Sequence, residues 1–120
     1  MLIRGRPRKY RVVRFDPKIS HFSPRGRPGR PEEAELTMDE FEAIRLYDFM
    51  GMSQKEAAKS MRISQQTFSR VLNKAHKTIA NALVTGKILK IQGGTYVLSL
   101  RQQQEDIPQG NIIATKSLQT

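Results

Sequence analysis

The stretch from residue 64 to residue 83 constrains the fold most, because its apolar residues recur at helical spacing. Their intervals of three, one, three and four residues place them on one stripe of a helix: Phe68, Val71, Leu72, Ala75, Ile79, Ala82 and Leu83. Ser64 is a favourable N-cap. The opposite face contains no carboxylate and carries Gln66, Arg70, Asn73, Lys74, Lys77 and Asn81. The sequence therefore predicts a long amphipathic helix with a polar, basic exposed face.

Two capping boxes predict two more helices before this one. In a capping box, a Ser or Thr side chain accepts from a backbone amide while a Glu three residues later reaches back. The box at Thr37–Glu40 starts a helix at about residue 38 that runs to about residue 50 and stops at Gly51, which tolerates a left-handed helix end. The box at Ser53–Glu56 opens a helix of about eight residues that ends near Arg62.

The short helix and the long helix are joined by residues 61–64 alone, as in a helix-turn-helix. Ala57 and Ala58 are small enough to let the two helices approach closely. Ile63 and Phe68 are expected to fill the angle between them. An ordinary helical hairpin uses the same ingredients, but the acid-free face of the second helix favours recognition of nucleic acid. We therefore expect a mainly α fold with a three-helix, helix-turn-helix core.

The remaining chain predicts extended structure. Residues 1–31 contain five of the six prolines, which excludes regular helix, although residues 10–15 can form a short strand. After the long helix, residues 87–92 and 95–100 resemble two strands, and the Gly93–Gly94 pair between them predicts a tight turn. The expected fold thus includes a carboxyl-terminal β-hairpin.

These features divide the chain into three parts. Residues 1–31 form an extended basic arm and turn segment, and residues 32–100 form the helix-turn-helix domain with its hairpin. Residues 101–120 are polar and lack a periodic apolar face, so they are expected to be a flexible tail.

Positive charge is concentrated in two blocks. The whole chain has a formal net charge of +10. Residues 1–30 hold 10 basic and 1 acidic side chain, and residues 61–90 hold 6 basic and none acidic, whereas residues 31–60 are acidic overall. One such block is often only solvated surface, but two together favour a polyanionic partner such as nucleic acid. An anionic membrane surface is the competing partner.

Other classes of protein lack support in the sequence. No apolar run approaches the roughly 18 residues of a membrane span, and no signal peptide is recognisable, so we expect a cytoplasmic protein without membrane contact. Cysteine is absent and there are only two histidines, so we expect no metal, no cofactor and no redox chemistry. No nucleophile elbow or phosphate-binding loop occurs, and we do not expect an enzyme.

The first turns of a recognition helix contact base edges in the major groove. The side chains predicted for this role are Gln65, Gln66, Thr67, Ser69 and Arg70. Glutamine can pair with adenine through two hydrogen bonds, arginine with guanine, and threonine can touch a thymine methyl group. Contacts to phosphates or to the minor groove are predicted for Arg4, Arg6, Arg8, Lys9, Arg11, Asn73, Lys74 and Lys77.

The expected partner is double-stranded DNA, bound by a homodimer, because one short helix offers few base contacts and paired half-sites add affinity. The hairpin at residues 88–100 is the candidate dimer contact. The segment Pro24–Pro28 matches the core of an AT-hook, which lays Arg side chains in an A·T minor groove, but the same residues suit a structural turn.

Several segments together resemble the UPF0251 (DUF134) family. They are residues 37–46, 53–58 and 64–70, joined by Pro7-Arg8-Lys9, the turn at residues 22–28 and the ending Ile91–Gly94. The resemblance runs from about Arg6 to Gly94. It implies a DNA-binding protein with a helix-turn-helix similar to region 4 of sigma factors.

The chain departs from that family in two places. Some relatives carry cysteines where this chain has Tyr10 and Arg14, so a metal or redox role suggested for them does not carry over. Arg62 replaces the glycine common in the helix-turn-helix bend, which predicts strain if this residue is left-handed.

A sequence-specific transcriptional regulator is therefore the leading hypothesis, and an RNA-binding or ribosome-associated basic protein is the alternative. Gln65, Gln66 and Arg70 on a capped helix favour DNA, because the deep major groove of RNA excludes such a helix. RNA readers also tend to expose stacking aromatic residues. A protein-interaction adaptor would show no salt-dependent affinity for DNA.

Overall fold

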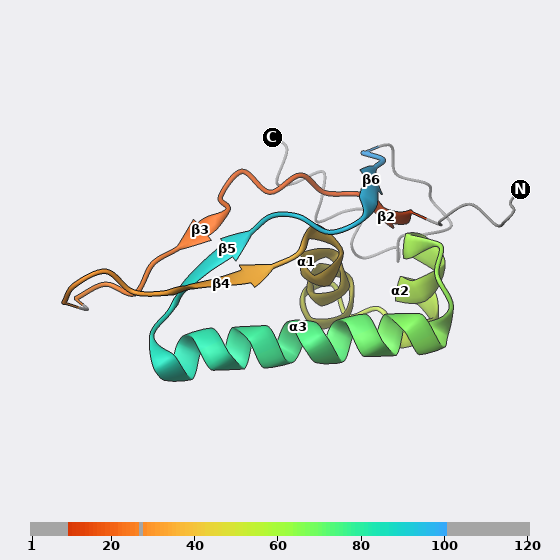
Figure 1. The fold of residues 1–120 in the computed structure, drawn as a ribbon. Coiled ribbons are helices and arrows are strands. Elements are labelled where there is room, and N and C mark those ends of the chain that lie inside the picture. The colour runs from red at the N-terminus through yellow and green to blue at the C-terminus, as the bar shows by residue number, and fades with distance from the viewer. Residues whose placement is uncertain (1–9, 27, 101–120) are drawn as a thin grey trace, which may run out of the picture.

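Three helices and two small sheets make up the part of the chain that the computed structural model describes, residues 10–26 and 28–100 (Figure 1). The helical elements are α1 (Met38–Ile44), its π-helical continuation η1 (Arg45–Phe49), α2 (Gln54–Met61) and α3 (Gln65–Thr85). The strands are β2 (Arg11–Val13), β3 (His21–Phe22), β4 (Glu33–Leu36), β5 (Ile88–Ile91) and β6 (Tyr96–Leu98).

The helices begin where their capping residues predict. The Thr37 and Ser53 hydroxyls accept hydrogen bonds from the backbone amides of Glu40 and Glu56, and both glutamates bond back to the cap backbone. Ser64 caps α3 by accepting from the Thr67 amide at 3.0 Å. Local sequence therefore fixes all three helix starts.

The first helical region departs from a regular α-helix in its second half. From Arg45 to Phe49 the chain adopts π-helical geometry, and the Met50 amide donates to the Arg45 carbonyl at 2.9 Å. The widened turn is a local feature that the apolar pattern of this segment did not predict. The region then ends at Gly51, whose φ of +78° is the left-handed conformation expected there.

The turn between α2 and α3 is short and contains the one non-glycine residue of the described chain with positive φ. Arg62 has φ +59° and ψ +44°, and its amide donates to backbone carbonyls at the end of α2. Arg62 thus has the left-handed conformation for which the sequence predicted strain. Such a conformation costs an L-residue roughly 1–2 kcal/mol, so the rest of the fold must enforce it.

The predicted carboxyl-terminal hairpin is wrong, because β5 and β6 lie in different sheets. Strand β5 is the centre of a three-stranded sheet, parallel to β4 and antiparallel to β3, whereas β6 runs parallel to β2. The Gly93–Gly94 turn does not reverse the chain. Instead it crosses the start of α1, where the Met38 amide donates to the Gly93 carbonyl at 3.0 Å. A Cβ on Gly94 would lie 2.8 Å from the Asp39 carboxylate, so glycine permits this crossing.

Two groups of buried apolar residues hold the elements together. The first joins α1, η1, α2 and the beginning of α3 and comprises Ala43, Leu46, Met52, Ala57, Ala58, Met61, Phe68, Val71 and Leu72. The second lies under the strands and comprises Val13, Leu36, Met38, Ala75 and Ile91. Phe68 is fully buried between α2 and α3, as predicted for the residue that fills their angle.

One member of the predicted apolar stripe is not buried. Leu83 is 78% exposed, whereas its neighbour Ala82 is 6% exposed and faces the fold. Consecutive helical residues point about 100° apart, and the sheet covers only the Ala82 side of the last turns. Placing Leu83 on the buried stripe was therefore wrong.

A buried polar network, which the sequence patterns did not reveal, anchors the chain just after β2. The Glu42 carboxylate is fully buried and accepts two hydrogen bonds from the Arg45 guanidinium, at 2.8 and 2.9 Å, and one from the Arg14 backbone amide at 3.0 Å. The Arg14 side chain donates to the Ser60 hydroxyl at 3.1 Å. Residues 11–14 are thus fixed against α1 and α2 and are part of the fold.

Candidate nucleic-acid interface

The first two turns of α3 present three polar side chains to solvent. Gln65, Gln66 and Arg70 are exposed and make no hydrogen bond or ion pair with any residue that the structure describes. Directly beneath them, Phe68 and Val71 are buried in the helical core. A rigid support under free polar side chains is the arrangement that recognition of a ligand requires.

The other two predicted base readers are placed differently. Thr67 and Ser69 are only half exposed. The Thr67 hydroxyl accepts a hydrogen bond from the Ser64 hydroxyl at 2.9 Å, and the Thr67 backbone amide donates to the Ser64 hydroxyl oxygen. Thr67 therefore serves the cap of α3, which leaves its methyl group as its available contact surface.

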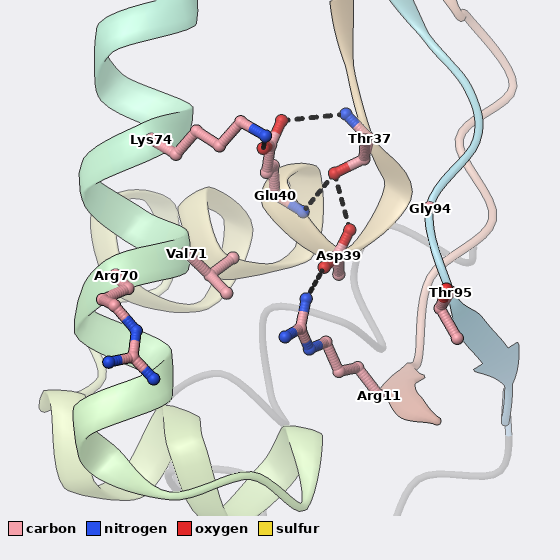
Figure 2. Close-up of a pocket in the computed structure, with 9 residues that line it drawn as sticks. All are labelled: Arg11, Thr37, Asp39, Glu40, Arg70, Val71, Lys74, Gly94 and Thr95. Atoms are coloured by element: carbon pink, nitrogen blue, oxygen red, sulfur yellow. Dashed lines mark hydrogen bonds and ion pairs between the residues drawn. The ribbon is translucent and has the colours of Figure 1, made fainter. Parts of the chain in front are cut away.

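Next to this surface lies an open cleft of about 340 Å³ between α3, the start of α1 and strand β2 (Figure 2). Arg70 and Lys74 extend from α3 on one side, and Arg11 extends from β2 on the other. Asp39 and Glu40, at the start of α1, lie between them. The cleft therefore combines three cations with two carboxylates.

The three cations of this cleft differ in how closely each is paired with a carboxylate. Arg11 donates to Asp39 at 2.6 Å, and the Asp39 carboxylate also accepts from the Thr37 hydroxyl. The Lys74 ammonium lies 3.8 Å from Glu40, but its side chain is 76% exposed, so this pair is weak and easily exchanged. Arg70 has no acidic partner among the described residues. Of the three cations, Arg70 is thus the most available to an external anion or base.

The predicted phosphate contacts on α3 extend the same surface. Asn73 and Lys77 are exposed and follow Gln66 at helical intervals of seven and eleven residues, which places them on one line of the helix. The residues that the structure brings together are Gln66, Arg70, Asn73, Lys74 and Lys77, with Arg11 beside them. Arg4, Arg6, Arg8 and Lys9 lie outside the described residues.

Two exposed lysines of α2 also belong to the candidate interface, although the analysis of motifs did not single them out. Lys55 and Lys59 are exposed on α2, Lys55 in its first turn and Lys59 in its last, next to the turn that leads into α3. Their spacing of four residues puts them on one helix face, and buried Ala57 and Ala58 occupy the other. In the sequence, the signal that these two positions face solvent was that both carry lysine and neither carries an apolar residue.

The segment that matches an AT-hook lies in the long connection between β3 and β4. Figure 1 shows this connection at the end of the molecule opposite the start of α3. Arg25 is exposed, and Gly26 and Gly29 have φ values near +80°. Arg27 lies outside the described residues, so the choice between an AT-hook and a structural turn stays a prediction.

Two features of other functional classes, metal-binding clusters and membrane-spanning helices, are absent from the described part of the chain. It contains no cluster of three or more histidine, aspartate or glutamate side chains placed to hold a metal ion. His76 and Asp48 are both exposed, and the His76 Nε2 atom lies 2.7 Å from the Asp48 Oδ2 atom. None of its helices has the length and apolar character to cross a membrane.

A small protein of three helices and two small sheets, with a basic exposed face on its longest helix, is the class that this geometry defines. The chain belongs to the family described as protein of unknown function DUF134, which it matches over residues 1–99. No solved structure resembles it significantly.

Its relatives include several UPF0251 proteins. One from Thermoanaerobacter pseudethanolicus is 46% identical over 92 residues, which cover 76% of this chain and 78% of the relative. Another from a Thermoanaerobacter species is 43% identical over 100 residues, covering 82% and 88%. A third from Caldicellulosiruptor bescii is 47% identical over 92 residues, covering 77% of this chain and 64% of that longer protein.

Proposed function

We propose that this protein is a transcriptional regulator that binds double-stranded DNA in a sequence-specific manner through a helix-turn-helix formed by α2 and α3. One observation carries the proposal: the exposed face at the start of α3 lacks acidic residues and presents Gln65, Gln66 and Arg70 without partners in the described chain. Polar groups held ready on a rigid helix suit the hydrogen-bonding edges of bases in the major groove.

The proposed docking assigns one role to each helix. The first two turns of α3 enter the major groove, where Gln66 and Arg70, four residues apart, reach neighbouring base pairs. Helix α2 crosses the DNA backbone, which brings Lys55 and Lys59 near phosphates. Lys77 and Asn73, further along α3, contact the backbone at the groove edge. Base contacts thus supply specificity, and lysines supply affinity.

The amino-terminal arm is proposed to follow the same duplex. Arg11, the first residue of β2, lies across the cleft from Arg70, so β2 begins beside the proposed recognition surface. Residues 1–9 contain three arginines and one lysine and no acidic residue. Since each neutralised phosphate contributes about 0.9 to the slope of log affinity against log salt, an arm that engages about three phosphates steepens this slope by about 2.7.

Removal of residues 1–9 tests the arm. The truncated protein retains Arg11, Arg14 and the Glu42 network, so its thermal unfolding midpoint is expected to match that of the full chain. We expect weaker binding to all DNA sequences and a shallower salt slope. An unchanged affinity and slope in the folded truncation would remove the arm from the interface.

The function itself is tested by fluorescence anisotropy of the purified full chain with random-sequence duplex DNA and with an RNA duplex of the same sequence. We expect salt-dependent binding and a preference for the DNA duplex. Repeated selection from random duplexes is then expected to enrich one sequence. Stronger binding to RNA would favour the alternative function, and no enrichment would reject sequence-specific recognition.

A further inference from the structure

Arg11 is held in the cleft at both ends of its side chain. Its backbone belongs to β2, which pairs in parallel with β6 through Arg11 and Tyr96, and the next two residues, Val12 and Val13, are buried. At the other end, the Arg11 Nη1 atom donates to the Asp39 Oδ2 atom at 2.6 Å. The guanidinium group is therefore fixed in one place before any ligand arrives.

Asp39 is itself a rigid support for this guanidinium group. Its side chain is only 5% exposed. One carboxylate oxygen accepts from Arg11, and the other accepts from the Thr37 hydroxyl at 2.6 Å. The chain at Gly94 covers the second oxygen so closely that a Cβ there would lie 2.8 Å from it. A carboxylate held by two donors and covered by backbone has little room to move, so it can fix the rotamer of its partner.

The ion pair leaves part of the Arg11 guanidinium unused. A guanidinium group carries five N–H donors in a planar fork. Only Nη1 is bonded to Asp39, and the Nε and Nη2 atoms have no hydrogen-bond partner among the residues that the structure describes. The side chain is 35% exposed and lines the cleft across from Arg70 (Figure 2). A second edge of the fork is thus available for a bidentate contact with an anion.

We propose that Arg11 binds a backbone phosphate of the DNA site and that Asp39 is the positioning residue that holds Arg11 for this contact. The proposal rests on the proposed function, since it places the phosphate beside the groove that Arg70 enters. Lys74 extends into the same cleft. Converging cations suit a charged phosphate with several acceptor oxygens better than the neutral edge of a base. Asp39 touches no DNA and acts through Arg11 alone.

Two opposing effects of Asp39 on DNA affinity follow from this geometry. A flexible arginine loses rotamer freedom when it contacts DNA, which lowers affinity by roughly two- to tenfold, whereas Arg11 is already ordered by the fold. The negative charge of Asp39 acts in the other direction, because it repels phosphates. Since the phosphate is proposed to bind a different edge of the guanidinium group, Arg11 shields it from Asp39. We therefore expect the positioning effect to outweigh the repulsion.

The neighbouring carboxylate in the cleft offers a matched control. The Glu40 side chain is also 5% exposed, but its nearest cation is the Lys74 ammonium at 3.8 Å, on a side chain that is 76% exposed. Glu40 therefore attracts a mobile cation without fixing it. Glu40→Gln keeps an acceptor for the Thr37 backbone amide, because glutamine also serves at this position of a capping box. Asp39→Asn and Glu40→Gln change the net charge equally.

The two variants are compared as purified full chains by fluorescence anisotropy with random-sequence duplex DNA. Asp39→Asn keeps an acceptor for the Thr37 hydroxyl but replaces the charged support of Arg11 with a neutral amide. We expect it to bind roughly two- to tenfold more weakly than wild type, although its net positive charge is higher. Glu40→Gln is expected to bind at least as tightly as wild type. Equal or tighter binding by folded Asp39→Asn would overturn the positioning role.

Substitution of Arg11 separates a DNA contact from a purely structural ion pair. Arg11→Ala is expected to lower the salt slope by about 0.9, the value for one phosphate. Adding Asp39→Asn to Arg11→Ala is expected to weaken binding no further, because the residue that it positions is already absent. A further loss in that background would mean that Asp39 acts through the fold, and an unchanged affinity and slope for Arg11→Ala would remove the contact.

A conservative variant keeps the test decisive if Asp39→Asn does not fold. Arg11→Lys retains the charge and can pair with Asp39, but one ammonium group does not reproduce the planar fork that bonds the carboxylate and a phosphate together. We expect a wild-type unfolding midpoint and an affinity between those of wild type and Arg11→Ala. Wild-type affinity would overturn the bridging contact. If the wild-type chain itself binds no duplex, the proposed function fails; if it binds and these variants bind equally well, only the Arg11 contact fails.

Discussion

The two halves of α3 share one helix and one exposed face, yet they differ in what they present and in what supports them. Residues 65–77 are polar and basic outside and pack inside on α1 and α2 through Phe68, Val71 and Leu72. Residues 78–85 are uncharged, expose Leu83 and Val84, and run beneath β4 and β5 (Figure 1). The exposed side chains of α3 thus change from basic to uncharged along the helix, while its buried side follows the element beneath it.

The largest difference between the halves is expected in stability. Phe68→Ala removes a fully buried ring from the joint of α2 and α3 and is expected to lower the free energy of unfolding by about 3–5 kcal/mol. Leu83→Ala, in the exposed part of the other half, is expected to change it by less than about 0.5 kcal/mol. Urea denaturation of both variants measures this difference. Similar losses for the two would show that Leu83 is buried in the free protein.

The ends of α3 are the next point of comparison. Ser64→Ala removes the side chain that caps the Thr67 amide and is expected to cost about 1 kcal/mol. Gly86→Ala is expected to cost a similar amount, because Gly86 has φ +69° at the carboxyl-terminal cap. The same denaturation experiment tests both. A neutral Ser64→Ala variant would mean that packing alone fixes the start of α3.

The smallest effect is expected at the turn that precedes α3. Arg62→Gly relieves the cost of a left-handed arginine but loosens the unfolded chain, so the two terms partly cancel. We expect a gain in stability of up to about 1 kcal/mol, which urea denaturation measures. A loss of stability would indicate that the arginine side chain contributes a contact worth more than the strain it introduces.

The sequence predicted the structural features that depend on residues close together in the chain. Helix starts were found because Thr37, Ser53 and Ser64 form their caps with residues three positions away. The left-handed bend at Arg62 was considered because glycine is common in the bend of a helix-turn-helix. The long helix was predicted because its apolar period is local as well. Its exposed face could be listed in advance for the same reason, and so could Gln65, Gln66 and Arg70.

The sequence failed where distant segments decide the structure. Gly93–Gly94 between two strand-like segments suggests a hairpin, but β5 finds partners in β3 and β4, and β6 finds one in β2. The site shows the same limit. Nothing near Arg11 or Lys74 in the sequence indicates that Asp39 and Glu40 lie beside them in the cleft. The burial of Glu42 likewise depends on two separate segments, one with Glu42 and Arg45 and the other with Arg14.

The measurement that tests the account most directly compares Arg70→Ala with Lys77→Ala on the selected DNA sequence and on random duplex DNA. Arg70 is assigned to a base and Lys77 to a phosphate. Arg70→Ala is expected to cost about 1–3 kcal/mol on the selected sequence and little on random DNA, so that sequence preference relaxes. Lys77→Ala is expected to weaken binding to both duplexes alike and to lower the salt slope by about one. Equal losses on both duplexes for both variants would contradict base reading by the first turns of α3.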